Sequence, residues 1–335
     1  MTVAAPRSWP VHFRDRLTSP VPAPKPEEVL RLARGMRPGD LTGVADIPVR
    51  YAPAPDDGTT SATWVGHATF VLRIGGLTVL TDPVWSRRIP GIRPRWTPPG
   101  VPLGSLDRID AVVISHNHYD HLDAPTIRRL PRTATMFVPA RLGPWFTRRG
   151  FRRVVELDWW ESASLPAPGG GEVRFDFVPA HHWSRRSLAD GCRTLWGGWV
   201  LTAPSADRVY FAGDTGYGRW FTRIAERYPG IDLALLPIGA YEPHWFLKNV
   251  HMDPEEAVRA AADLDARRMA TMHWGTFQLS AEPPAEPPAR ARKAWYDAGR
   301  DRADLWDLAV GEGRSLPAPE RDPEPPASAP STAGA

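Results

Sequence analysis

The sequence predicts a mixed α/β fold, because β-rich runs alternate with helical segments along most of the chain. Apolar runs such as residues 111–115 and 231–237 are short and bounded by polar residues or Gly, which is typical of buried strands. At Asp253-Pro254 an acidic N-cap precedes a proline, and this combination is a strong helix start. Both element types therefore contribute to the domain.

Composition narrows the class of protein. The chain has 335 residues and a formal net charge of +3, so it is long enough for a sizeable core and carries no strong charge excess. Because no run of about 18 apolar residues occurs, we expect no transmembrane helix. Cys192 is the only cysteine, which excludes an internal disulfide, and residues 1–10 lack an apolar signal core, so we expect a cytoplasmic protein. No Lys/Arg-dense arm or aromatic-basic stripe is present, which argues against a nucleic-acid partner.

The two ends of the chain differ in composition from its middle. Residues 1–58 are Pro-rich and are predicted to form an irregular arm that packs on the domain, with one short helix at 27–34. Residues 313–335 are rich in Pro, Ala, Ser and Glu, and we expect a disordered tail there. Residues 59–312 are left as a single domain.

The domain opens with a predicted β-hairpin. Gly75-Gly76 separates two β-rich runs, and a two-residue glycine turn joins antiparallel strands tightly. The next elements follow from apolar run length and from residues that begin or end helices, such as Pro125 and Gly150. The predicted elements of this half are strands 68–74, 77–81, 111–115 and 134–138 and helices 125–130 and 142–149.

The second half repeats this alternation. Residues 173–178 alternate apolar and polar side chains, as a half-buried strand does. The helix that begins at Asp253 is expected to run to about residue 265, and Gly299 is a plausible stop for the last helix. The predicted elements are strands 173–178, 195–202, 208–211, 231–237, 268–272 and 304–310 and helices 253–265 and 288–298.

A histidine-rich loop directly follows the predicted strand 111–115. Four side chains that can bind metals, those of His116, His118, Asp120 and His121, fall within six residues. Imidazole and carboxylate are ligands of zinc and also of iron and manganese. Without a metal, such groups would cost about 1–3 kcal/mol each when buried and unpaired. The loop therefore predicts a metal site rather than a solvated polar segment.

Further candidate ligands follow other predicted strands. His181-His182 come after strand 173–178, Asp214 comes after strand 208–211, and His273 comes after strand 268–272. Each alone is equally well explained as a turn residue or a satisfied polar group. Together with the histidine-rich loop they favour a pocket at which several strand ends converge.

The pattern His116-x-His118-x-Asp120-His121 resembles the metal-binding signature of the metallo-β-lactamase superfamily. Longer strings resemble one branch, the N-acylphosphatidylethanolamine-hydrolysing phospholipase D group. The resemblance covers about residues 60–280 and implies a four-layer αββα sandwich, the metallo-β-lactamase fold. The strings lie at residues 63–69, 80–83, 115–123, 179–183, 211–217, 251–257 and 272–276.

The resemblance also implies two divalent metal ions, expected to be zinc, with iron or manganese as alternatives. It assigns His116, His118 and His182 to the first ion, Asp120, His121 and His273 to the second, and Asp214 to a bridge between them. Because this chain has His181 where the family usually has another residue, His181 is the alternative to His182. The family further suggests a homodimer.

In such a centre a metal-bridging hydroxide is the nucleophile, so Cys192 needs no catalytic role. Asp120 and Asp214 would orient it. Asp82 is expected to orient ligands, or else to cap a turn before Pro83. His67 is predicted either to lie beside the metals or to be a buried histidine bonded to backbone. His251 is predicted either to contact the substrate or only to precede the helix that begins at Asp253.

The expected function is hydrolysis of a phosphodiester, of the phospholipase D type, in an N-acylphosphatidylethanolamine-like phospholipid. Fifteen tryptophans allow an apolar approach to the metals and peripheral contact with the inner face of the membrane. The first alternative is a lactonase or ester hydrolase acting on a soluble phosphosugar-like substrate. A nuclease, a β-lactam hydrolase and a non-catalytic metal-binding module are weaker alternatives, the last because all seven ligands are present.

Overall fold

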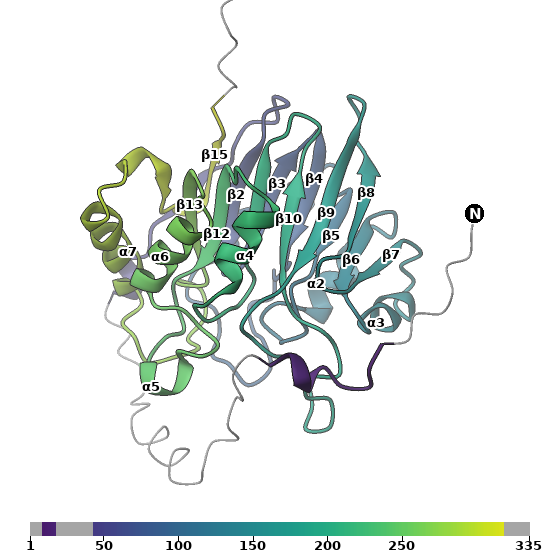
Figure 1. The fold of residues 1–335 in the computed structure, drawn as a ribbon, viewed down its shortest axis with the longest axis horizontal. Helices are drawn as coiled ribbons and strands as arrows, with labels where there is room; N and C mark the ends of the chain where they lie inside the picture. Colours follow the sequence, from purple (N-terminus) through teal and green to yellow (C-terminus); the bar gives the residue numbers. More distant parts are fainter. Residues whose placement is uncertain (1–8, 18–42, 318–335) are drawn as a thin grey trace, which may run out of the picture.

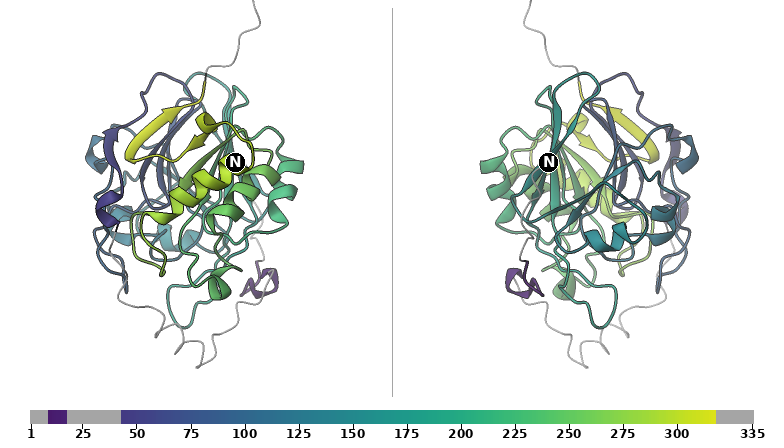
Figure 2. Two further views of the ribbon diagram at one scale, coloured as in Figure 1. Left: turned by 90° about the vertical axis from the view of Figure 1, so that its left-hand side faces the viewer. Right: turned by 90° about the vertical axis from the view of Figure 1, so that its right-hand side faces the viewer.

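The computed structural model describes residues 9–17 and 43–317. Two β-sheets pack face to face, and helices cover their outer faces (Figures 1 and 2). This arrangement confirms the predicted mixed α/β fold and its αββα layers. The predicted short helix at 27–34 lies outside the described residues.

The first sheet has eight strands in the order β1-β15-β2-β3-β4-β5-β6-β7. Its centre is antiparallel around the predicted glycine hairpin, and β4 to β7 run parallel. The strands are β1 Val49–Ala52, β2 Ser61–Gly66, β3 Thr69–Ile74, β4 Leu77–Thr81, β5 Ala111–Val113, β6 Thr135–Pro139, β7 Val154–Leu157 and β15 Val310–Ser315.

The second sheet has seven strands in the order β14-β13-β12-β11-β10-β9-β8. β8 to β11 pair antiparallel, whereas β11 to β14 are parallel. The strands are β8 Ser162–Pro166, β9 Glu172–Val178, β10 Gly198–Thr202, β11 Arg208–Phe211, β12 Leu233–Pro237, β13 Arg268–Met272 and β14 Leu305–Trp306.

Helices lie on both outer faces. α4, α6 and α7 cover the second sheet, and α2 and α3 lie against the first (Figure 2). α6 begins as its sequence predicts, because Asp253 accepts the Glu256 N–H while the Glu256 side chain accepts the Asp253 N–H. The helices are α2 Ala124–Arg129, α3 Gly143–Thr147, α4 Trp220–Arg227, α5 His244–Leu247, α6 Pro254–Asp263 and α7 Glu286–Asp297, with 3-10 turns η1 Arg14–Arg16, η2 Val44–Asp46, η3 Leu103–Ser105 and η4 Arg302–Asp304.

The main core lies between the sheets. Successive side chains of a strand point to opposite faces, so Val79 of β4 joins this core while Leu80 packs under α2 and α3. Phe137 of the first sheet stacks on Phe175 of the second with ring centroids 4.1 Å apart. This contact holds the two sheets in a fixed relation, and with them the loops at their edge.

Several predicted element bounds differ from the structure by one or two residues, and three predictions are wrong by more than that or in their topology. The predicted strand 304–310 is two strands, β14 in the second sheet and β15 in the first. β15 continues past the predicted domain end at 312, because Gly313 and Ser315 pair with β2. The strand predicted at 195–202 begins only at Gly198.

The predicted arm is partly built into the fold. β1 pairs with β15, and the side chain of Phe13 is 1% exposed. The N–H of Phe13 also donates to the carbonyl of Cys192 (2.7 Å). The domain core therefore includes residues from the segment that the sequence assigned to the arm.

Candidate metal centre

The parallel strands of both sheets end at one edge, and the candidate site residues follow those ends. Asp82 follows β4, the histidine-rich loop 115–121 follows β5, Asp214 follows β11 and His273 follows β13. In addition, His67 lies in the turn between β2 and β3, and His182 follows β9. The two sheets therefore bring together residues that are up to about 200 positions apart in the sequence.

The first group of donors consists of His116, His118 and His182. His116 Nε2 lies 2.8 Å from His118 Nδ1, and His182 Nε2 lies 3.2 Å from the same atom. Nitrogens that bind one zinc ion tetrahedrally at about 2.0–2.1 Å are roughly 3.3 Å apart. The three ring nitrogens therefore converge at nearly the spacing that a shared cation requires.

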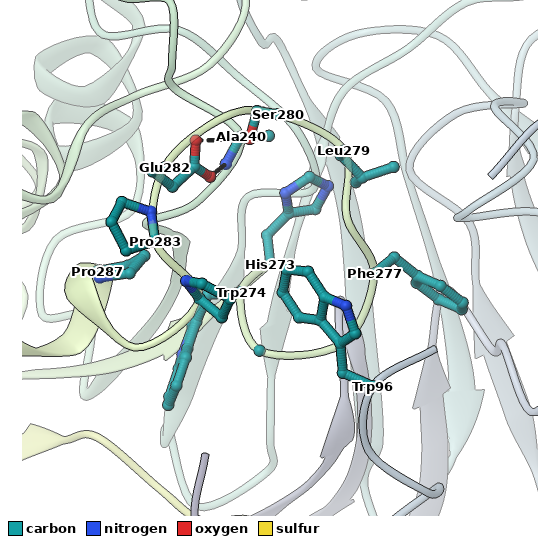
Figure 3. A pocket seen from close by; sticks show the side chains of 12 residues that line it. Trp96, Ala240, His273, Trp274, Phe277, Leu279, Ser280, Glu282, Pro283 and Pro287 are labelled. Carbon is teal, nitrogen blue, oxygen red and sulfur yellow. Dashed lines mark hydrogen bonds between the residues drawn. The ribbon is translucent and has the colours of Figure 1, made fainter. Parts of the chain in front are cut away.

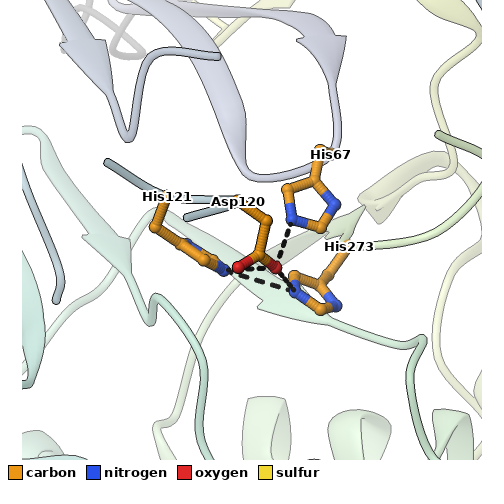
Figure 4. Close-up of side chains that lie close together, drawn as sticks. All are labelled: His67, Asp120, His121 and His273. Atoms are coloured by element: carbon orange, nitrogen blue, oxygen red, sulfur yellow. Dashed lines mark hydrogen bonds and ion pairs between the residues drawn. The ribbon is translucent and has the colours of Figure 1, made fainter. Parts of the chain in front are cut away.

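The second group consists of His67, Asp120, His121 and His273 (Figure 4). Asp120 Oδ2 is 3.1 Å from His67 Nε2, 3.4 Å from His121 Nε2 and 3.6 Å from His273 Nε2. Nε2 of His121 and Nε2 of His273 lie 3.3 Å apart. His67 thus lies beside the donors, as one of its two sequence interpretations predicts.

Asp214 lies between the two groups. Its Oδ2 is 3.1 Å from His121 Nε2, 3.8 Å from His182 Nε2 and 3.9 Å from His116 Nε2, and its Oδ1 is 3.0 Å from His273 Nε2. The carboxylate is 4% exposed. One side chain therefore reaches donors of both groups, as a bridging ligand would.

Hydrogen bonds behind the donors fix which ring nitrogens face the centre. Asp82 accepts from His121 Nδ1 (2.7 Å) and from the Ser115 N–H (2.7 Å) and hydroxyl. His182 Nδ1 donates to the Val250 carbonyl (3.0 Å). Because these bonds occupy Nδ1, the Nε2 lone pairs of His121 and His182 are directed at the centre.

The backbone is strained at three of these residues. His67, Asp82 and His273 have positive φ angles of 55°, 30° and 64°. Non-glycine residues in this region are uncommon, and they cluster where a site requires one particular side-chain direction. The fold therefore places these side chains at an energetic cost.

For most of the donors, the pKa shifts favour the protonation states that metal ligands need. Burial lowers the pKa of His67 to about 3 and that of His118 to about 4, and it also holds the pKa values of His116 and His182 well below the ordinary value. Burial raises the pKa of Asp214, but His121 and His273 outweigh it and hold that pKa well below its usual range. Neutral imidazoles and ionised carboxylates are the metal-binding forms.

His121 and His273 behave differently. Burial lowers both pKa values, but the carboxylates of Asp214 and Asp120 outweigh it, so the pKa of His121 lies well above its ordinary value and that of His273 is about 9. The two buried carboxylates thus favour positive charge on both imidazoles. Divalent cations would supply this positive charge instead, and together with the converging nitrogens this makes the donor set a good fit for metal ions.

The structure separates the two adjacent histidines of the third predicted ligand position. His182 belongs to the first donor group, whereas His181 belongs to none of the donor groups among the described residues. The backbone of His181 pairs with Thr215 and Gly216, and its ring lies near Trp220. The geometry thus favours His182 as the ligand.

We expect His182→Ala to lower the metal content of the purified protein and His181→Ala to leave it nearly unchanged. The first substitution removes a donor from the centre, and the second removes a ring outside it. Elemental analysis of both variants against wild type measures this difference. If the ranking is reversed, the ligand is His181.

His251 lies on the rim of the centre. Its ring centroid is 5.3 Å from that of His182 and 5.5 Å from that of His273, and it forms a further possible donor group with His182 and Asp214. Burial lowers the pKa of His251 to about 4. Its position next to the donors is consistent with the substrate-contacting alternative.

Two recesses adjoin the centre. A small pocket next to His273 is lined in part by Glu282, which accepts from the Ala240 N–H (2.6 Å) and from the Ser280 hydroxyl (2.6 Å) (Figure 3). An open groove begins at His118 and is lined by residues of the loop that follows His182. The aromatic and aliphatic residues of the pocket are Trp96, Trp274, Phe277 and Leu279, and the groove is lined by His118, Tyr119, Trp183, Arg185, Arg186, Ser187 and Leu188.

The sequence missed one residue that contacts this site. Adjacent arginines are typical of a solvated surface, but Arg186 is half-buried and donates hydrogen bonds to the metal-site loop. An arginine pair alone does not show which of its members bonds to a distant loop. The position of Arg186 four residues after His182 is the only signal in the sequence.

The chain is similar to known proteins over most of the domain that carries this centre. Residues 78–274 match the model of the "Beta-lactamase superfamily domain". An uncharacterized protein of Mycobacterium tuberculosis is 43% identical over 249 residues, which are 70% of this chain and 64% of that protein. The chain thus spans slightly less than two thirds of the length of that relative.

A second relative is matched over most of both chains. The N-acyl-phosphatidylethanolamine-hydrolyzing phospholipase D 1 of Caenorhabditis elegans is 36% identical over 292 residues, which cover 82% of this chain and 81% of that protein. Among solved structures, Igni18, a metallo hydrolase of Ignicoccus hospitalis, is 27% identical with a TM-score of 0.56, covering 76% of this chain and 97% of that one. None of the helices in residues 9–17 and 43–317 has the length and hydropathy of a membrane-spanning segment.

Proposed function

Because this chain belongs to the metallo-β-lactamase superfamily of metal-dependent hydrolases, we propose that it is a phosphodiesterase of the phospholipase D type. Its substrate would be an N-acylphosphatidylethanolamine-like phospholipid, cleaved by water to a phosphatidic acid and an N-acylethanolamine. The observation that carries the proposal is the complete donor set, with Asp214 between two groups of donors. The phospholipase D relative, matched over four fifths of both chains, supports the substrate class.

The residues of the centre would bind two metal ions. His116, His118 and His182 would hold one metal ion, Asp120, His121 and His273 a second, and Asp214 both. Two divalent ions, which we propose to be zinc, would supply a water nucleophile of lowered pKa and charge stabilisation at the phosphoryl group.

Three further residues of the site would position these ligands and the substrate. His67 holds Asp120 through the contact between Nε2 and Oδ2 (3.1 Å). Asp82 keeps His121 in the orientation that directs Nε2 inward. His251, whose ring lies next to those of His182 and His273, would contact the phosphoryl group of the substrate.

A lipid substrate must reach the centre from a bilayer. The groove that begins at His118 provides an approach with Trp183 and Leu188 along it. Leu188 is 92% exposed, so transfer of its side chain from water into the apolar part of a bilayer would be favourable. We infer that this loop makes peripheral contact with the membrane surface.

The test compares three substrates: bis(p-nitrophenyl) phosphate, N-acylphosphatidylethanolamine in mixed micelles, and phosphatidylethanolamine without the N-acyl group as the matched lipid. We expect cleavage of the first two, loss of both activities with a chelator, and weaker cleavage of the third. Cleavage of the simple diester alone would support a phosphodiesterase but contradict the proposed lipid substrate. Hydrolysis of lactones or carboxylic esters with neither phosphodiester cleaved would replace the proposal with an ester hydrolase.

A further inference from the structure

Arg186 connects two loops that come from different sheets. It lies four residues after His182 in the loop that follows β9, and its side chain reaches the loop that follows β5. These loops carry all three members of the first donor group. A connection between them therefore acts directly on the spacing of that group.

The contacts of the guanidinium are to backbone carbonyls. Nη1 of Arg186 donates to the carbonyls of Asn117 (2.9 Å) and Leu122 (2.7 Å). It also donates a longer bond to the His118 carbonyl (3.4 Å). Asn117 and Leu122 are the two ends of a turn in which the Leu122 N–H donates to the His118 carbonyl (2.9 Å). One nitrogen thus closes the turn that carries His118, Asp120 and His121.

A second set of contacts returns from the turn to the arginine. The ring of Tyr119 lies under the guanidinium, with Cζ 4.0 Å from the ring centroid, and the Tyr119 hydroxyl donates to the Arg186 carbonyl (2.9 Å). The Asp190 side chain accepts from the Arg186 N–H (3.0 Å), within the loop that follows β9. Arg186 is therefore fixed at its backbone and at its side chain.

We propose that Arg186 is a positioning residue that locks the histidine-rich turn against the loop of His182 and so sets the metal affinity of the centre. The inference rests on the proposed metal centre but not on its substrate. Arginine suits this role because its planar group donates in fixed directions and stacks on an aromatic ring at the same time. A lysine at this position would keep the charge but lose the stacking face.

The first experiment measures zinc affinity by competition with a chromogenic chelator in Arg186→Met, Arg186→Lys and the exposed control Arg193→Met. Replacing groups that orient metal ligands typically costs 10–100-fold in affinity. We expect a loss of about this size in Arg186→Met, a smaller loss in Arg186→Lys and wild-type affinity in Arg193→Met. If Arg186→Met does not fold, wild-type affinity in Arg186→Lys overturns the proposal.

The second experiment needs neither metal nor substrate. In the metal-free protein, amide hydrogen exchange of residues 116–122 should be faster in Arg186→Met than in wild type, while exchange in β11 and β13 is unchanged. Faster exchange throughout the chain would instead indicate a general loss of stability and contradict a local role.

Kinetics separate positioning from substrate binding. With saturating zinc, we expect Arg186→Met to lower kcat for bis(p-nitrophenyl) phosphate with little change in KM. An increase in KM for the lipid with unchanged zinc affinity would make Arg186 a headgroup contact and overturn the proposal. If N-acylphosphatidylethanolamine is not cleaved but zinc affinity and exchange respond as described, the proposed substrate fails and the role of Arg186 stands.

Discussion

Asp214→Ala is expected to abolish hydrolysis and to weaken metal binding more than any other single substitution in the centre. Asp214 has carboxylate oxygens within 4 Å of His116, His121, His182 and His273, so its removal opens both donor groups at once. Replacing a residue that only orients a ligand typically lowers metal affinity by about 10–100-fold. Removing a ligand that both donor groups share should lower metal affinity by more than about 100-fold. Chelator competition and turnover of bis(p-nitrophenyl) phosphate measure the two effects.

The matched control is Asp214→Asn, which keeps the shape of the side chain and one oxygen acceptor but removes the charge. We expect it to retain more metal than Asp214→Ala while still losing most of the activity. Full activity of Asp214→Ala with two bound metals would refute the bridging assignment.

The second large effect is expected at Asp82, which touches no substrate. Its carboxylate is fully buried and accepts from His121 Nδ1 and from the Ser115 N–H. Asp82→Ala leaves these buried donors without partners, at a cost of about 1–3 kcal/mol each, and frees the ring of His121. We expect lower stability of the apoprotein in urea unfolding together with a 10–100-fold loss of metal affinity.

Asp82→Asn separates the two parts of this effect. Asparagine tolerates the positive φ of 30° as aspartate does, so the backbone is preserved. The Ser115 N–H and His121 Nδ1 bond different carboxylate oxygens of Asp82, and asparagine replaces one of these acceptors by an NH2 donor. Metal affinity should therefore fall with a smaller loss of stability, and wild-type affinity in this variant would rule out the orienting role.

Most of the candidate site could be predicted because it follows strand ends. β11 and β13 have the bounds that the apolar runs predict, and Asp214 and His273 lie just beyond them. A polar residue directly after a buried strand lies at the edge of its sheet, and the parallel strands of both sheets end at the same edge of the domain. The choice between His181 and His182 depends on side-chain direction, which a sequence pattern does not encode.

Other parts of the fold depend on tertiary partners that no local pattern specifies. Residues 305–310 form a nearly continuous apolar run, and nothing in its periodicity shows that the chain crosses from one sheet to the other inside it. β8 is an edge strand with small, partly exposed side chains, so it lacks the apolar signal of a buried strand. Arg186 is half-buried only because its partners are carbonyls of a distant loop.

Hydrolysis by this protein is proposed to depend on two metal ions bound by the donor groups. The most direct test is elemental analysis of the purified protein before and after dialysis against a chelator, with hydrolysis of bis(p-nitrophenyl) phosphate followed in the same samples. We expect about two divalent ions per chain, loss of activity when they are removed, and recovery when zinc is added back. Metal-free protein that hydrolyses the diester at the original rate would contradict it.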